Sequence, residues 1–256
     1  MQNEKQKLLT NKQNAIKYNS VIFYCCVDQR EIIMTEKAEN TRANILNTAL
    51  KHFWKHGFSG VSLRNIVKDA GLTTGAFYKY YPTKEKLFDA LVDPYVDAIY
   101  KIYDDILEHF MNLSVTEQTQ NMTETSMDGM EQIIDYIYDH YDHFRLLLKC
   151  GDSGKYEAFI HNMVEREIKS GEIYIEKMRA IGINVPQVSE SLIHMIYTGF
   201  FSSVFQIIEH DIDRETAKEN VHQLREFNTG GWERLWGIQF PAENHAMPGC
   251  DTLEKE

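Results

Sequence analysis

The chain has 256 residues, of which 43% are hydrophobic and 25% charged, as in ordinary globular proteins and unlike disordered ones. This length allows one large domain or two small ones, each with its own core. The net charge of −11 argues against a protein that coats nucleic acid along its whole surface.

The charge is unevenly distributed along the chain. Residues 41–92 contain eight basic and three acidic residues, a net charge of +5, so the remainder carries −16. Phosphate groups attract a basic segment and repel an acidic one. The sequence therefore predicts a basic module that binds nucleic acid, joined to an acidic domain that does not.

Residues 1–33 differ from the rest, since 1–20 are polar without an amphipathic period and 21–27 form a short apolar run. We expect translation to begin at Met34, because Gln29-Arg30-Glu31 can be encoded by a purine run of the ribosome-binding type. The alternative is a genuine, poorly structured N-terminal arm.

The first predicted helix covers residues 41–56. Its apolar side chains recur as pairs four residues apart, which forms one stripe on a helix, and Gly57 is placed to end it. Ser62 is placed to cap a second helix. Gly71 then allows the positive φ of a tight turn, and Thr73 or Thr74 begins a third helix that ends before Pro82.

A fourth helix begins after Thr83, has Glu85 in its first turn, bends near Pro94 and runs to about Met111. Residues 112–125 are polar and are expected to form a loop or a weak turn. Helical patterns follow at about 127–149 with a break near His140, and at about 155–180, 187–210 and 213–236. No segment shows strand alternation, so the predicted fold is all-α; residues 239–256 are expected to be a disordered acidic tail.

Residues 62–81 have the pattern of a helix-turn-helix whose second helix enters the major groove of DNA. The first amides after Ser62, together with Arg64, can hold a phosphate, and the small Gly75 and Ala76 let the helix approach base edges. The remaining candidates are side chains that can hydrogen-bond to bases or phosphates: Thr73, Thr74, Tyr78, Lys79 and Tyr80. The alternative is a solvated helix face. Phe77 and Tyr81 are expected in the core.

The same stretch resembles the DNA-binding head of the TetR family of bacterial regulators over about residues 39–99. The matching positions are Phe53, Gly57, Ser62, Ala70-Gly71-Leu72, Thr73, Gly75, Phe77-Tyr78, Lys79-Tyr80, Tyr81 and Thr83-Lys84-Glu85. The resemblance implies that Lys84 is a phosphate anchor. Thr74 stands where many members have lysine, and Tyr80 where histidine is frequent, so base preference cannot be transferred.

The resemblance also implies that residues 100–238 form a helical domain that binds an effector and dimerises. A head of this size contacts few bases, so specificity also calls for two half-sites and hence a homodimer. The expected dimer interface lies on the last two helices, at Phe200, Phe201, Val204, Phe205, Ile208, Trp232 and Trp236. The alternative is a core helix of a monomer.

The expected effector cavity has an aromatic and methionine lining that suits a small apolar or aromatic molecule. The candidates are Tyr103, Leu107, Phe110, Tyr138, Phe144, Phe159, Met163 and His194. The alternative for each residue is that it packs in the protein core and contacts no effector.

The cysteines have no zinc-site spacing and no secretory signal precedes them, which favours a cytoplasmic protein without a resident metal or other cofactor. The most apolar window, residues 191–208, is too polar for a lipid-facing span, so no membrane partner is expected. No nucleophile–base set indicates an enzyme. The sequence predicts a regulator of transcription, a repressor that a small effector releases from double-stranded operator DNA; the alternative is a ligand-independent architectural DNA-binding protein.

Overall fold

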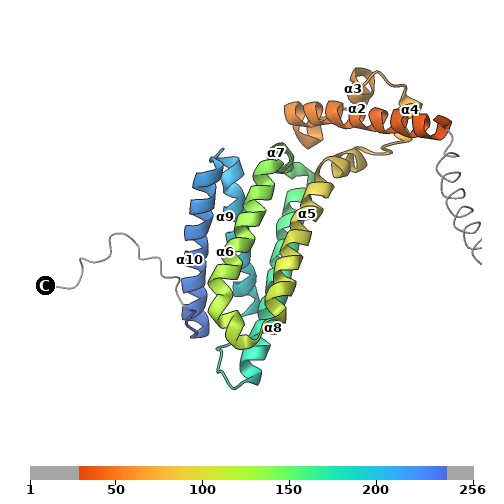
Figure 1. The fold of residues 1–256 in the computed structure, drawn as a ribbon. Coiled ribbons are helices and arrows are strands. Elements are labelled where there is room, and N and C mark those ends of the chain that lie inside the picture. Colours follow the sequence, from red (N-terminus) through yellow and green to blue (C-terminus); the bar gives the residue numbers. More distant parts are fainter. Residues whose placement is uncertain (1–28, 241–256) are drawn as a thin grey trace, which may run out of the picture. The chain divides into compact units, whose positions relative to one another are not determined.

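The computed structural model describes residues 29–240, with the side chains of 29–35 and 121–127 left aside. Within these residues the protein is all-helical and contains no strand, which confirms the predicted fold class. The elements are α2 Gln29–Gly60, α3 Leu63–Asp69, α4 Thr74–Tyr78, α5 Lys84–Asn112, α6 Val115–Asp139, α7 Tyr141–Lys149, the 3-10 turn η1 Gly151–Ser153, α8 Lys155–Ala180, α9 Glu190–Glu209 and α10 Arg214–Trp236 (Figure 1).

Two sequence expectations concern the ends of the chain. The expectations for residues 1–28 and 241–256 lie outside the described residues. The disordered tail was expected to begin at residue 239, but Phe240 is buried, and its N–H donates to the Glu233 carboxylate at 2.6 Å. Residues 29–33, expected within a poorly structured extension, form the first turns of α2.

The chain divides into two compact units, and the division falls inside α2. Of the described residues, the first unit comprises those up to Ala49 together with Leu63–Pro82, and the second comprises Leu50–Ser62 and those from Thr83 to Phe240. The boundary expected between residues 99 and 100 falls inside α5, which is continuous through Pro94.

The first unit is a small helical cluster with its own core. Ile45 and Ala49 of α2 are fully buried, as are Ile66 of α3 and Phe77 of α4. The side-chain amide of Asn44 donates to the main-chain oxygen of Ala70 at 2.9 Å, which ties α2 to the turn after α3.

The second unit is a bundle in which α8 packs along α9, and α6 along both α5 and α10 (Figure 1). Residues 112–125, expected as a loop, contain the start of α6 instead. Ser114 accepts the N–H of Glu117, and the Glu117 carboxylate accepts the N–H of Ser114 at 2.9 Å, a capping box that starts the helix.

Other predicted boundaries are confirmed. Gly57 breaks the α2 helix with φ 67°, and Thr83 caps α5 by accepting the N–H of Lys86 at 3.2 Å. His140 separates α6 from α7.

Among the described helices, α9 alone is long and apolar enough to cross a membrane by length and composition, with 39% of its most apolar window buried.

Candidate nucleic-acid interface and ligand cavity

The turn between α3 and α4 has the geometry that the sequence predicts. Gly71 has φ 68°, and the N–H groups of Gly71 and Leu72 donate to the carbonyls of Lys68 and Val67, each at 3.1 Å. These bonds satisfy the last carbonyls of α3. Thr73 then caps α4 by accepting the N–H of Ala76 at 3.3 Å.

The outer surface of α4 is made of small and hydrogen-bonding groups. Thr73, Thr74, Gly75, Tyr78 and Lys79 are exposed, and Ala76 and Tyr80 are half-buried. Phe77 and Tyr81 are buried beneath them, as expected. Arg64 is exposed on α3.

Gly75 leaves an open surface. A Cβ built at this residue would meet no heavy atom within 4 Å in the described part of the chain. The backbone of α4 is therefore uncovered at the point where close approach to a base edge would be needed.

Two predicted phosphate-binding residues belong to the second unit. Ser62 is half-buried in the two-residue link between α2 and α3. The ammonium of Lys84 donates to the main-chain oxygen of Phe58 at 3.0 Å and lies 4.5 Å from the centroid of the Phe58 ring. Lys84 thus has a structural role that the resemblance did not indicate.

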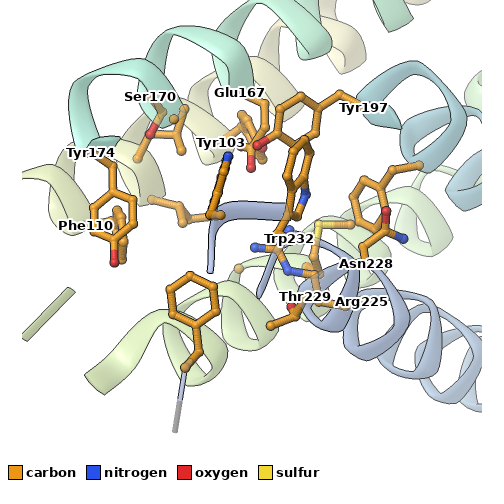
Figure 2. A pocket seen from close by; sticks show the side chains of 18 residues that line it. Tyr103, Phe110, Glu167, Ser170, Tyr174, Tyr197, Arg225, Asn228, Thr229 and Trp232 are labelled. Atoms are coloured by element: carbon orange, nitrogen blue, oxygen red, sulfur yellow. The ribbon is translucent and has the colours of Figure 1, made fainter. Parts of the chain in front are cut away.

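The second unit contains a cavity of about 100 Å³ between α5, α6, α8, α9 and α10 (Figure 2). On this measure one water needs roughly 10–15 Å³, so the space is larger than a single water site. Its walls are mostly aromatic and apolar. The lining residues are Tyr103, Ile106, Leu107, Phe110, Gly129, Met130, Glu167, Ser170, Gly171, Tyr174, Tyr197, Phe200, Arg225, Asn228, Thr229, Trp232, Trp236 and Phe240.

A polar group of three residues interrupts the apolar wall (Figure 2). The hydroxyl of Tyr103 donates to the Glu167 carboxylate, and burial followed by the negative charge of Glu167 raises the Tyr103 pKa well above its ordinary value. The Nε atom of Arg225 is buried without a hydrogen-bond partner among the described residues. An unsatisfied buried donor costs about 1–3 kcal/mol.

Three of the eight predicted cavity residues, Tyr103, Leu107 and Phe110, line this cavity. The other five do not line it, for distinct packing reasons. Tyr138 donates to the Ile212 carbonyl at 2.6 Å, and His194 is exposed. Phe144, Phe159 and Met163 are buried, and both phenylalanine rings contact Phe205.

The seven residues expected at a dimer interface are all buried within their own chain. Trp232 and Trp236 stack on one another and line the cavity, while Phe205 packs against Phe144 and Phe159. In the single chain they are therefore core or cavity residues, and their part in a dimer interface stays a prediction. The exposed apolar side chains of the same two helices are Leu192 and Met195 on α9 and Phe227 on α10.

Sequence reasoning also missed the contribution of α10 to the cavity. Arg225, Asn228 and Thr229 lie on α10 between Val221 and Trp232, both of which are buried. These polar residues lie three or four positions from Val221 or Trp232, and residues with that spacing share one face of a helix. This spacing was the signal in the sequence that they face the bundle.

Comparisons with known proteins agree with the helix-turn-helix geometry. The sequence pattern of the family described as "Bacterial regulatory proteins, tetR family" matches residues 45–91. The HTH-type regulator TtgR of Pseudomonas putida is 40% identical over 58 residues, which cover 23% of this chain and 28% of TtgR. The HTH-type regulator YdgC of Bacillus subtilis is 28% identical over 110 residues, 43% of this chain and 53% of YdgC.

The chain thus spans about a quarter to a half of the length of these curated relatives. Over a longer stretch, a solved TetR-family structure from Syntrophomonas wolfei superposes with a TM-score of 0.51, covering 75% of this chain and 95% of the other, at 17% identity. This likeness shows the fold alone. Residues 45–91 and the helix-turn-helix within them thus have the sequence pattern of the tetR family of bacterial regulatory proteins.

Proposed function

We propose that the protein is a cytoplasmic homodimer that represses transcription by binding an operator through α4, and that a small molecule in the bundle cavity releases it. The observation that carries the proposal is the surface of α4, where hydroxyls, a tyrosine and a lysine surround an uncovered glycine above a buried Phe77.

The exposed groups of α4 suit the two kinds of contact that a DNA-reading helix makes, to bases and to phosphates. Thr73 and Thr74 lie in its first turn, where hydroxyls and free amides can reach bases and phosphate. Because Thr73 uses its oxygen as an acceptor for the cap, its hydroxyl proton remains available to a phosphate. Tyr78 and Lys79 extend this surface toward the end of the helix.

A single reading helix of this length covers too few base pairs for specificity, so two copies are needed. We assign the dimer contact to the exposed apolar surface of α9 and α10, with Met195 and Phe227 at its centre. Their side chains are 69% and 79% exposed in the single chain. Burying such residues is worth roughly 1.5–3 kcal/mol each. A dimer through this surface would also cover the apolar side of α9.

The lining of the cavity supports a proposal for the chemical class of the effector. Trp232, Tyr174 and Phe110 favour a flat aromatic body, and the buried Nε of Arg225 calls for a hydrogen-bond acceptor. We therefore propose an aromatic molecule that carries a carboxylate or carbonyl oxygen. Such a ligand would satisfy Arg225 and leave the bond between Tyr103 and Glu167 intact.

The DNA function is tested with the purified full-length chain and a pool of random duplexes. Repeated selection should yield one palindromic sequence, hereafter the selected duplex, with two half-sites separated by about one helical turn. Fluorescence anisotropy should then show that this preference over scrambled duplex persists as salt rises. Equal affinity for both duplexes at every salt concentration would instead indicate the architectural alternative.

The effector class is tested by thermal unfolding with three matched probes: 2-naphthoate, 2-naphthaldehyde and 2-naphthylmethylamine. The acid and the aldehyde should stabilise the protein and the amine should not, and Arg225→Leu should remove the difference. Stabilisation by none of the three would contradict the effector class while leaving the DNA assay intact. The stabilising probes should also lower affinity for the selected duplex, since release requires weaker binding of DNA by the ligand-bound state.

A further inference from the structure

Two histidines and a glutamate from neighbouring helices meet outside the cavity. His161 and Glu165 lie one turn apart on α8, and His194 lies in the first half of α9. Their nearest ligand atoms all lie within 4.8 Å of one another, and the imidazole centroids are 6.4 Å apart. All three side chains are exposed, and none lines the cavity.

We propose that His161, Glu165 and His194 bind a divalent transition-metal ion, with Zn²⁺ as the reference ion. Two imidazole nitrogens and one carboxylate oxygen are a donor set that Zn²⁺ takes in proteins, with a fourth position left to water. At metal–ligand distances of about 2.1 Å, donor atoms on a tetrahedral ion lie roughly 3.4 Å apart. Separations of up to 4.8 Å would have to shorten by about 1.4 Å, through side-chain rotation, to reach that value.

A neighbouring hydroxyl supports the orientation of one ligand. Thr198 Oγ1 lies 3.4 Å from His194 Nδ1, one turn along α9. When this hydroxyl accepts a hydrogen bond from Nδ1–H, the other ring nitrogen, Nε2, is free to bind the metal. Metal-binding histidines commonly donate their second ring nitrogen to an outer partner in this way. The arrangement therefore includes an orienting partner as well as three ligands.

The donor set also decides which ions are excluded. Mg²⁺ prefers six oxygen ligands in near-octahedral geometry, and two imidazoles do not meet that preference. Zn²⁺, Ni²⁺ and Co²⁺ accept imidazole nitrogen readily. The site is thus one for a borderline transition metal, and it links α8 to α9 independently of DNA or effector.

The test is a calorimetric titration of the full-length chain with ZnCl₂. Thiolates also bind Zn²⁺, so the chain carries serine in place of Cys25, Cys26 and Cys250. Each chain should bind one Zn²⁺ and no Mg²⁺. Loss of even an outer-shell contact typically weakens metal binding about 10–100-fold, so His161→Gln and His194→Gln should each weaken it at least tenfold.

The matched control is His210→Gln, which replaces an exposed histidine at the end of α9, outside the cluster. It should bind Zn²⁺ like the parent. Co²⁺ gives a second readout, since its visible absorption intensifies in tetrahedral coordination and should do so only when all three ligands are present. Unchanged Zn²⁺ affinity in the double variant His161→Gln/His194→Gln, or the absence of one-to-one binding in the parent, would overturn the proposal.

Discussion

Lys84 and Phe58 are joined twice, since the Lys84 ammonium donates to the Phe58 carbonyl at 3.0 Å and lies 4.5 Å from the centre of its ring. Phe58 itself packs edge-on against Phe88 of α5, with ring centroids 5.3 Å apart. The pair therefore holds the residues after the break at Gly57 against the start of α5. This is a structural contact within the second unit, whatever Lys84 contributes to binding phosphate.

Replacing Lys84 by methionine should lower the free energy of unfolding by about 1 kcal/mol, because a hydrogen bond from a charged group and a cation–π contact are lost at a half-buried position. Urea unfolding measures this change. Lys86→Met is the control, because the Lys86 side chain is 67% exposed and forms only a surface ion pair with Asp89 at 3.2 Å. Equal unfolding midpoints for the two variants would mean that the Phe58 contact contributes nothing.

His143 should make the protein less stable below neutral pH. Burial lowers the pKa of His143 from 6.5, although its hydrogen bond to the Leu91 carbonyl at 2.9 Å raises the pKa in part. The ring stacks on Tyr95, and His140 and Asp142 are its titratable neighbours. The unfolded chain therefore binds a proton at His143 more readily than the folded chain does. Stability is retained above pH 6.5 and falls as the pH drops toward the lowered pKa of the folded state.

His143→Gln should flatten this loss between about pH 7 and pH 5.5, whereas His210→Gln, at an exposed site, should not. The measurement is the urea midpoint at each pH. An identical pH dependence in the His143 variant and the parent would assign the effect to another group.

Phe227 tests the proposed dimer surface, because its side chain is 79% exposed in the single chain. Phe227→Ser should weaken the dimer by about 2 kcal/mol or more, roughly thirtyfold, as for a central apolar interface residue. Analytical ultracentrifugation gives the dissociation constant. Ile181→Ser, at another exposed apolar residue just after α8, should leave it unchanged. A Phe227 variant that dimerises like the parent would place the interface elsewhere.

Thr74 offers a gain-of-affinity test at the start of α4. It is exposed at the first position of this helix. Thr74→Lys should add one phosphate contact, tighten binding at low salt and steepen the dependence of log K on log salt by about 0.9. Fluorescence anisotropy with the selected duplex measures the slope. Thr74→Gln adds length without charge and should leave the slope as it was; a lysine variant with the parent slope would mean that residue 74 lies away from the phosphates.

Local signals predicted the first unit well, because its turn depends on single residues. Gly71 has the positive φ that the turn needs, Thr73 caps α4, and Phe77 is buried as expected. The capping box at Ser114 was an equally local signal, but the polar composition of residues 112–125 obscured it. A helix start can thus be read from two residues even where the segment lacks apolar periodicity.

Apolar side chains surround α9, so its sequence could not show which side faces its own bundle. Phe200 and Phe205 are buried in the chain, whereas Met195 is exposed. Likewise, the sequence pattern alone does not distinguish whether aromatic residues such as Phe144 and Phe159 line a cavity or pack in the core. Only the packing of α10 reveals that Arg225 and Trp232 line the cavity.

Gly75 gives the most direct test of the central claim, that α4 contacts DNA. Its position is exposed and open, so Gly75→Ala and Gly75→Leu should fold normally and gain up to about 1 kcal/mol of helix propensity. The measurement is the affinity of each variant for the selected duplex, with the melting temperature recorded alongside. The account predicts a graded loss, small for alanine and at least about tenfold for leucine, since a larger side chain holds the helix away from the bases. A leucine variant that melts and binds DNA like the parent would contradict it.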